Sequence, residues 1–490
     1  MTAQQIHIPS LEVREIGTVK EAKHGIVKVA GLPSCVYGQL VELGDGVKGM
    51  VIGFNPQEVL LIMLGDDRGI HVGDTVFSHA ELLSVPVGEA FLGRMVNCLG
   101  QPLDGKGPVA SQERAPVFRQ AAGVMDREPL TEPLLTGIKI LDVAIPIGKG
   151  QRELILGDRQ TGKSSLAVDA ILNQQGKDVL CIYCWVGGSL SAFRKILHVL
   201  VPRGALSYTM AVCAFADHSP AEQYLCPYTA AALGEYFMAH GRDVLVVFDD
   251  LTKHAWAYRQ MSLLMERAPG REAYPGDIFY VHSQLMERAG RLTAALGGGT
   301  MTFLPIAETL QGDVTGYIQS NLISMTDGQI YLNTALFREG FKPAIDMGLS
   351  VSRIGSKVQC QAIRELSEGL RLTYTQYREM LRMTRLRTRL SEEAMERLRR
   401  GEALRELLIQ ENAHPVSLAE AIVLFYAFKR KILEVLPPED LKRFKHEFFL
   451  FLQRQHPALI EQLEREQLLT HDLQEALNQA FIDYFRAMKE

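Results

Sequence analysis

The sequence predicts a multidomain chain: an N-terminal β-barrel at 1–85, a central α/β domain at 86–356 and a C-terminal α-helical bundle at 357–490. Three observations support this order. Short apolar stretches separated by tight turns come first, apolar strands alternating with helix-like segments follow, and strand signals then disappear. With 490 residues, 47% of them hydrophobic, the chain has enough apolar material for several cores.

The first domain is expected between about Ile16 and Leu83. Its apolar runs are GIVKVAGL, GQLVELGDGVKGMVIGF and EVLLIMLGDD, with Asp45-Gly46 and Asn55-Pro56 as turn signals. Strands this short, joined by turns this tight, favour a small barrel or sandwich.

The last domain is expected to be helical from about Lys357 onward. Ser417-Leu-Ala-Glu420 is a capping-box pattern, and Leu418, Ile422 and Phe425 follow at helical spacing. We expect the Pro437-Pro438 pair to stop that helix and LKRFKHEFFLFLQ to form another.

Charge and apolar patterning exclude some classes of protein. A formal charge of -5 argues against a surface built wholly for nucleic acid. The arginine-dense stretch Arg378–Arg400 can be a nucleic-acid contact, a solvated helix face or a surface for an acidic partner, and the interspersed glutamates favour the last two. No apolar run spans a bilayer, and Met1–Leu11 lacks a signal-peptide layout. We therefore expect a cytosolic chain, or one peripheral to a membrane through partners.

The strongest motif has the spacing G-x-x-x-x-G-K-[ST] and lies between an apolar run, ELIL, and a helix-like segment, SLAVDAILNQQ. It consists of Gly157, Asp158, Arg159, Gln160, Thr161, Gly162, Lys163 and Ser164. The glycines let backbone amides close around phosphate oxygens at a helix N-terminus. Lys163 can reach the β- and γ-phosphates, and the Ser164 hydroxyl can ligate Mg²⁺.

A second element of the site is expected on a neighbouring strand. DVLVVFDD is an apolar run that ends in Asp249-Asp250, about 85 residues after the phosphate loop. A carboxylate at that end of a strand can hold Mg²⁺ through water. The two motifs together predict a magnesium–nucleotide site, whereas hydrolysis needs in addition a residue that positions the attacking water.

With this pair of motifs in place, the chain resembles the alpha subunit of the rotary F-type ATP synthase from about Ile16 to nearly the C-terminus. The segments that carry the resemblance stand in the family's order: GDRQTGKSS, VVFDDLTKHAWAYRQMSLLMERAPGREAYPGDIFYVHSQLMERA, ALGGGTMTFLPIAET, ISMTDGQIYL and GLSVSRIGSKVQ. The resemblance implies a β-barrel, a RecA-like P-loop nucleotide-binding domain and a helical bundle.

In that family, alpha and beta subunits alternate in a ring of six around a rotating gamma shaft. The beta subunit does the chemistry, and alpha holds ATP and Mg²⁺ that do not turn over. Beta carries a catalytic glutamate after its next strand, where ordinary alpha subunits have glutamine. Here the segment Trp185-Val-Gly-Gly188 places Gly188 at that position. Glycine has no side chain to polarise water, so we expect very slow turnover.

The resemblance also assigns residues beyond the phosphate loop. Arg353 in SVSRIGS matches the family's arginine finger, which acts on the neighbouring beta site, and a salt-bridged surface arginine is the alternative. Ser350 falls where the family requires a residue for activity. Lys342-Pro343, Gln410 and Asn412 sit where the family contacts adenine and ribose, although the family usually has arginine and a second glutamine at two of these positions. An ordinary polar loop is the alternative there.

The N-terminal segment departs from the family. About fifteen residues precede the predicted barrel, and Ile8-Pro9 is a poor helix former, whereas the family has a longer helical segment that docks the delta subunit of the stator. Together with Gly188, this suggests an alternate, second-copy form of the enzyme with unusual stator attachment.

The preferred function is that of a non-catalytic ring member at the cytoplasmic face of a bacterial inner membrane, which meets the membrane only through the ion-translocating sector. A Rho-type RNA translocase is one rival, but it needs an aromatic-lined basic surface and its own catalytic carboxylate. A catalytic ring ATPase of the beta or protein-export type is the other. Gly188 argues against both, and we expect no nucleic-acid partner.

Overall fold

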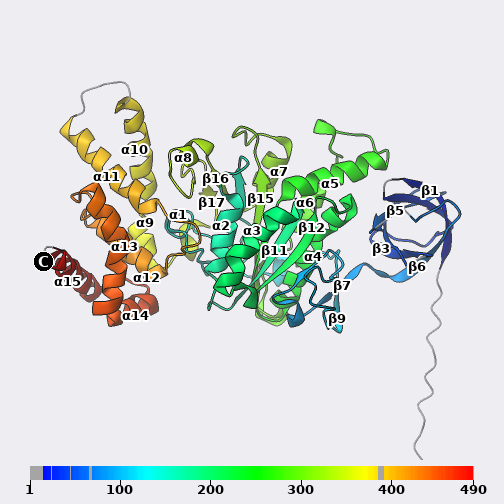
Figure 1. Cartoon of the computed structure of the whole chain (residues 1–490), viewed down its shortest axis with the longest axis horizontal. Coiled ribbons are helices and arrows are strands. Elements are labelled where there is room, and N and C mark those ends of the chain that lie inside the picture. Colours follow the sequence, from blue (N-terminus) through cyan, green and yellow to red (C-terminus); the bar gives the residue numbers. More distant parts are fainter. Residues whose placement is uncertain (1–14, 24, 45, 66–68, 385–390, 489–490) are drawn as a thin grey trace, which may run out of the picture.

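The computed structural model describes residues 15–23, 25–44, 46–65, 69–384 and 391–488. Three blocks follow one another along the long axis, with the barrel at one end and the C-terminal helices at the other (Figure 1). The predicted architecture of β-barrel, α/β domain and helical domain is confirmed. The Ile8-Pro9 segment and Asp45 of the predicted turn lie outside the described residues.

Six antiparallel strands close the barrel in the order β1-β2-β5-β4-β3-β6, with β1 paired to β6. The strands are β1 Ile16–Lys23, β2 Ile26–Ala30, β3 Gln39–Leu43, β4 Lys48–Phe54, β5 Val59–Leu64 and β6 Thr75–Leu82. Their inward side chains form a core of their own, which includes Val19, Val41 and Leu61. Because successive side chains of a strand point to opposite faces, each strand contributes alternate residues to the barrel core and to its outer surface.

The barrel packs on the central domain through its outer face. Ile26, Met50 and Ile62 belong to the same apolar cluster as Leu225 and Leu233 of the central domain. A short two-stranded sheet of β7 (Ser84–Val87) and β9 (Glu113–Pro116) follows the barrel. The exact domain boundaries stay predictions.

The central domain is built on a mostly parallel sheet in the order β17-β16-β10-β15-β13-β11-β12-β8. Its strands are β8 Met95–Val96, β10 Leu154–Gly157, β11 Val179–Gly188, β12 Thr209–Phe215, β13 Asp243–Asp249, β14 Gly290–Arg291, β15 Thr300–Glu308, β16 Gly328–Leu332 and β17 Val351–Ser352. The antiparallel strands β14 and β17 lie beside β15 and β16.

Both faces of this sheet are buried, which explains why its strands are continuous apolar runs. Along β11, Cys181 and Tyr183 belong to one core, whereas Ile182 and Cys184 belong to the other. The helices that cover the sheet are α1 Lys139–Ala144, α2 Lys163–Leu172, α3 Leu190–Leu200, α4 Pro220–Ala239, α5 Leu251–Leu264, α6 Ile278–Met286, α7 Tyr317–Met325 and α8 Thr334–Arg338. Helices α2 and α3 pack on the Tyr183 face, and α4 and α5 pack on the Ile182 face.

The C-terminal domain is helical, as predicted. Its helices are α9 Gln361–Ser367, α10 Leu370–Thr384, α11 Glu392–Leu408, α12 Leu418–Lys429, α13 Pro438–Gln455, α14 Pro457–Glu466 and α15 His471–Ala487. Ser417 caps α12 and accepts a hydrogen bond from the Glu420 amide at 3.1 Å. The expectation that Pro437-Pro438 stops α12 was wrong: α12 ends at Lys429, and the pair begins α13, because proline fits the first helical turn.

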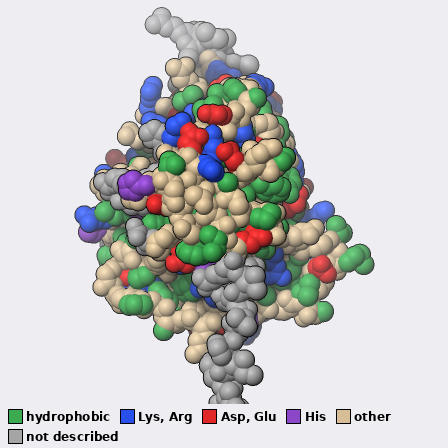
Figure 2. Space-filling model, turned by 90° about the vertical axis from the view of Figure 1, so that its right-hand side faces the viewer, with side chains coloured by type: hydrophobic (Ala, Val, Ile, Leu, Met, Phe, Trp, Pro, Cys, Tyr) green, Lys and Arg blue, Asp and Glu red, His purple; other side chains and the backbone are tan. Residues whose placement is uncertain are grey.

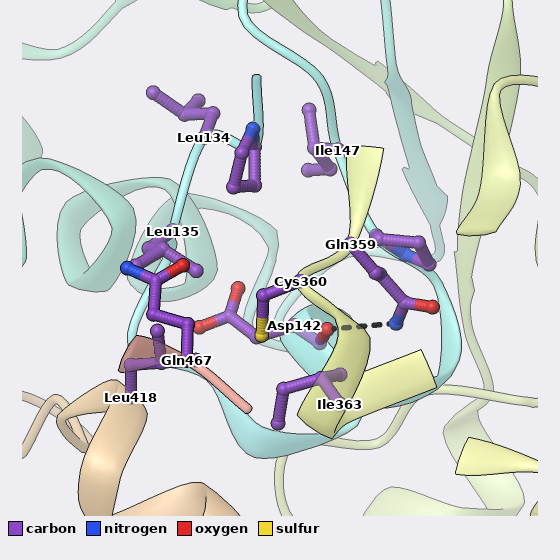
Figure 3. A pocket seen from close by; sticks show the side chains of 11 residues that line it. Leu134, Leu135, Asp142, Ile147, Gln359, Cys360, Ile363, Leu418 and Gln467 are labelled. Atoms are coloured by element: carbon purple, nitrogen blue, oxygen red, sulfur yellow. Dashed lines mark hydrogen bonds between the residues drawn. The ribbon is translucent and has the colours of Figure 1, made fainter. Parts of the chain in front are cut away.

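The central and C-terminal domains share one continuous core, which joins the α2 face of the sheet to α12 and α13. A small cavity of about 40 Å³ lies at this junction. Figure 3 shows residues that line it, among them Asp142 on α1, Gln359 before α9, and Leu418 at the start of α12. The Gln359 carboxamide donates to the Asp142 carbonyl at 3.2 Å. The joint between the two domains is therefore packed and hydrogen-bonded rather than a loose linker.

Basic and acidic side chains are interspersed on the barrel end of the molecule (Figure 2). The Arg378–Arg400 stretch lies on α10 and α11, apart from 385–390, which are outside the described residues. Among the helices that the structure describes, none combines the length and apolar character needed to cross a bilayer.

Candidate nucleotide-binding site

The phosphate loop follows β10 and leads directly into α2, so the predicted strand–loop–helix unit is confirmed. Glycine is required at two points. A Cβ on Gly157 would lie 2.9 Å from the Leu332 carbonyl oxygen, and Gly162 has a φ of 99°, where side chains are strained. The loop therefore delivers the first amides of α2 to the carboxyl edge of the sheet, a ready anion site.

Lys163 lies across the loop and is almost fully buried. Its ammonium donates to the carbonyls of Gly157 and Asp158 at 2.9 and 2.6 Å. Burial lowers the pKa of Lys163, and the nearby carboxylates, first among them Glu308, act in the opposite direction. The lysine is held among acceptors at the position where a phosphate would neutralise its charge.

Ser164 and Asp249 meet at the start of α2. The Ser164 hydroxyl donates to Asp249 Oδ2 at 2.6 Å, and the buried Tyr183 hydroxyl donates to the same oxygen at 2.8 Å. Strand β13 does not adjoin β10, because β15 lies between them. The carboxylate nevertheless reaches the loop, since the parallel strands all end at one edge.

The Asp158 side chain fastens the phosphate loop to the segments that follow β15 and β16. Asp158 accepts hydrogen bonds from the Thr309 hydroxyl (2.7 Å), the Gly312 amide (2.8 Å) and the Thr334 hydroxyl (2.8 Å). Burial raises the pKa of Asp158, but these hydrogen bonds outweigh burial, and the net shift is downward. The carboxylate therefore anchors the loop, which leaves its backbone amides free to face a ligand.

Of the three remaining polar residues of the loop, Thr161 is buried and its hydroxyl donates to the Asp158 carbonyl at 2.8 Å, whereas Arg159 and Gln160 point outward. The Arg159 guanidinium is exposed and forms an ion pair with Glu308 at 2.9 Å. Gln160 is exposed and has a φ of 63°. Neither side chain is held over the loop in this structure.

Sequence reasoning named the pair Asp249-Asp250 but missed two further charged residues at the same edge, Glu308 and Lys253. Glu308 ends β15, and Asp250 follows β13, where its carboxylate pairs with the Lys253 ammonium at 2.8 Å. Burial raises the pKa of Asp250 to about 6. The available signal was the run TMTFLPIAE, which ends in a carboxylate as DVLVVFD does.

Position 188 is occupied by a neighbour's side chain. A Cβ added to Gly188 would lie 2.2 Å from Trp185 Cζ2 and 2.8 Å from Trp185 Nε1. The indole is buried against Phe193, with ring centroids 5.5 Å apart. The space that a water-orienting side chain would enter is thus filled by an aromatic ring.

The predicted base-binding residues come together around the 409–416 loop. The Gln410 amide donates to the Lys342 carbonyl at 2.8 Å, which places the two segments side by side. The Gln410 carboxamide is engaged within the protein, accepting from the Lys139 amide and donating to the Gly137 carbonyl. The Lys342 ammonium lies 4.8 Å from the Phe337 ring centre, and Asn412 is exposed.

Arg353 lies away from the phosphate loop, directly after the edge strand β17. Its side chain is exposed, while its amide donates to the Asp327 carbonyl at 2.8 Å. Ser350 is fully buried, and its hydroxyl accepts from the Tyr331 amide at 2.9 Å. The Arg371 guanidinium donates to the Ser350 carbonyl. Ser350 therefore helps to fix the strand that presents Arg353.

Fold and site together define a P-loop nucleotide-binding protein with a barrel before the nucleotide domain and a helical domain after it. Three family descriptions match in the same order: the beta-barrel domain of the ATP synthase alpha/beta family at 12–78, its nucleotide-binding domain at 137–352, and the C-terminal domain of the ATP synthase alpha/beta chain at 359–484. The chain belongs to the ATP synthase alpha/beta family.

Similar proteins extend over nearly the whole chain. It is 46% identical over 475 residues to ATP synthase subunit alpha of Clostridium botulinum (strain Hall). The matched region covers 97% of this chain and 94% of that protein. It is 45% identical over 474 residues to ATP synthase subunit alpha of Clostridium acetobutylicum, with the same coverage. The resemblance inferred from the motifs is therefore confirmed.

Proposed function

We propose that the chain is a non-catalytic alpha subunit of the F-type ATP synthase head, which binds Mg-ATP and contributes Arg353 to the catalytic site of an adjacent beta subunit. The observation that carries the proposal is the combination of a complete phosphate loop with a glycine at position 188. The loop supplies binding groups, and the glycine removes the group that would orient water.

The donor set fits a magnesium nucleotide. The first amides of α2 and the Lys163 ammonium suit phosphate oxygens, and the Ser164 hydroxyl with the Asp249 carboxylate suits Mg²⁺. When bound, the ion neutralises phosphate charge and orients the phosphates. The backbone of the loop, from Gly157 to Ser164, would contact the phosphates, since the Asp158 side chain is committed to anchoring.

The base and ribose end is proposed to lie between Lys342-Pro343 and the loop that carries Gln410 and Asn412. The hydrogen bond between the Gln410 amide and the Lys342 carbonyl supports a common surface from these two segments. The loop also reaches α2, because the Ala413 amide donates to Asp169 at 2.7 Å. The surface is therefore tied to the helix that begins at the phosphate loop.

Slow ATP hydrolysis in this chain's own site is expected, because the nearby carboxylates are held in ion pairs. A general base must be within reach of the attacking water and free to accept its proton. Glu308 is paired with Arg159, and Asp250 is paired with Lys253. The Trp185 indole, which fills the space beside Gly188, is only a hydrogen-bond donor, so it cannot take a proton from water.

Arg353 is proposed as an arginine finger acting across the subunit interface. Its exposure at the sheet edge and its fixed backbone support this role. Such a guanidinium stabilises charge on the transferring phosphoryl group and is worth roughly 10³–10⁵ in rate. Ser350 would act through the packing of the strand before Arg353 rather than on the substrate.

The assembly implied is a ring of alternating alpha and beta subunits around a gamma shaft, held by a stator and joined to an ion-translocating membrane sector. We place it at the cytoplasmic face of a bacterial inner membrane. The family relation supports a peripheral head subunit.

The purified full-length chain tests the proposal. We expect it to bind Mg-ATP by calorimetry and to hydrolyse the bound nucleotide with negligible steady-state turnover. Brisk turnover by the chain alone would contradict the non-catalytic assignment, and turnover stimulated by RNA would favour a nucleic-acid translocase. If the chain does not bind nucleotide, the proposed function is wrong.

A further inference from the structure

Trp185 has a buried polar atom that the proposed function does not yet use. Its side chain is 5% exposed, and within the described residues its indole Nε1 has no hydrogen-bond partner. An unpaired buried donor is costly, so a group of this kind calls for an acceptor that the chain itself does not supply.

The ring lies on the nucleotide face of the sheet. Trp185 is in register with Asp249 on the neighbouring strand, so their side chains share one face. Tyr183, two residues earlier on the same face, already touches the Asp249 carboxylate. Trp185 therefore lies about 7 Å beyond Tyr183 toward the carboxyl edge of the sheet, where ligands of open α/β sheets bind.

Two ammonium groups lie near the indole, and the carboxylates of Asp249 and Asp250 lie close to one of them, Lys253. The Lys253 ammonium lies 5.8 Å from the centre of the Trp185 ring, and Lys163 lies across the adjacent phosphate loop. Trp185 Nε1 is also 2.8 Å from the place where a side chain at Gly188 would begin. Lys253 is already paired with Asp250, so what this end lacks is an acceptor for the indole, and a phosphate oxygen held near Lys163 would supply it.

We infer that Trp185 is a nucleotide-binding residue of this chain, whose indole takes the place of a side chain at position 188 and donates its N–H to an oxygen of the terminal phosphate of ATP. This rests on the proposed function. It adds a specificity element, because ADP lacks the phosphate that would accept the hydrogen bond.

The test compares Mg-ATP and Mg-ADP binding by calorimetry with the full-length wild type and with Trp185→Phe, which keeps an aromatic ring but loses the donor. We expect Trp185→Phe to weaken ATP binding about tenfold and to leave ADP binding unchanged. Trp256→Phe, which alters a 38% exposed tryptophan on α5, is the matched control and should change neither affinity. Equal effects on both nucleotides, or none, would overturn the inference.

A spectroscopic readout keeps the inference testable if Trp185→Phe folds poorly. The chain has two tryptophans, so Trp256→Phe leaves Trp185 as the sole emitter. We expect Mg-ATP to change its emission more than Mg-ADP does, and identical responses would overturn the inference. If the wild type binds both nucleotides, such a failure concerns Trp185 alone. If it binds neither, the proposed function itself fails.

Discussion

The Ser164 hydroxyl donates a 2.6 Å hydrogen bond to the Asp249 carboxylate, although 85 residues separate the two in the chain. The bond joins the start of α2 to the end of β13, and it pairs two oxygens of the kind that Mg²⁺ prefers. The contact brings together the two groups that we propose as the metal site.

Removal of the Ser164 hydroxyl should therefore weaken the effect of Mg²⁺ on ATP binding. We expect Ser164→Ala to reduce the affinity gained on adding Mg²⁺ by about tenfold, because one oxygen partner is lost. Calorimetric titrations of ATP with and without Mg²⁺ measure the difference. Ser165→Ala, one residue further along α2, is the control and should behave as wild type. An unaltered Mg²⁺ effect in Ser164→Ala would argue against this metal site.

Gly188 and Trp185 should be coupled in stability. Gly188→Gln must displace a buried ring, since its Cβ would lie 2.2 Å from Trp185 Cζ2. We expect a loss of about 1–3 kcal/mol in the free energy of unfolding, as in other overpacked cores. Trp185→Ala should lower stability by itself but make the Gly188→Gln change far less harmful, which a double-mutant cycle measures by denaturant unfolding.

Gly276→Gln is the matched control for that cycle. No atom would lie within 4 Å of a Cβ at Gly276, so this substitution should leave stability nearly unchanged. Additive effects of Gly188→Gln and Trp185→Ala would show that the ring does not occupy the space assigned to it.

The phosphate-loop unit and its acidic partner were predictable from the sequence because both depend on local patterns. An apolar run before Gly157 and a helix-like run after Ser164 suffice for strand, loop and helix. Asp249 was predictable in the same way, as the polar end of an apolar strand. The contact between them follows from the common edge of parallel strands.

Other features of the site depend on side-chain packing between distant segments, which a single sequence does not reveal. Asp158 stands in the phosphate-loop motif, yet its three partners lie more than 150 residues further along the chain. Nothing in the sequence indicates that the Trp185 ring fills the space at Gly188. Gln410 was assigned to the base, whereas its carboxamide bonds to the protein because the loop folds back on Gly137.

The buried histidine pair on α5 and α6 should make the chain acid-sensitive. His254 Nε2 lies 3.1 Å from the Tyr224 carbonyl and therefore donates, which leaves Nδ1 to accept from His282 at 3.3 Å. Both rings are thus neutral. Burial lowers the pKa of His254 to about 4, and burial also lowers the pKa of His282.

The unfolded chain binds a proton at His254 near pH 6.5, whereas the folded chain does so only near pH 4. The free energy of unfolding therefore falls as the pH drops through this window, by up to about 3 kcal/mol from His254. His254→Gln keeps a donor for the Tyr224 carbonyl and should make this loss smaller. Thermal midpoints at pH 7 and pH 5 measure it, with His446→Gln on the exposed face of α13 as control. If the thermal midpoint of His254→Gln falls between pH 7 and pH 5 as much as that of the wild type, His254 is not the cause of the acid sensitivity.

The most direct test of the account is steady-state ATP hydrolysis by an F-type head assembled from Arg353→Ala and wild-type beta and gamma subunits, with nucleotide bound to this chain measured in the same sample. We predict that hydrolysis falls by roughly 10³-fold or more while this chain keeps its nucleotide. Arg454→Ala, at an exposed arginine of α13, should leave both quantities unchanged. Near-normal hydrolysis by the Arg353→Ala head would contradict the claim that this chain serves its neighbour's site.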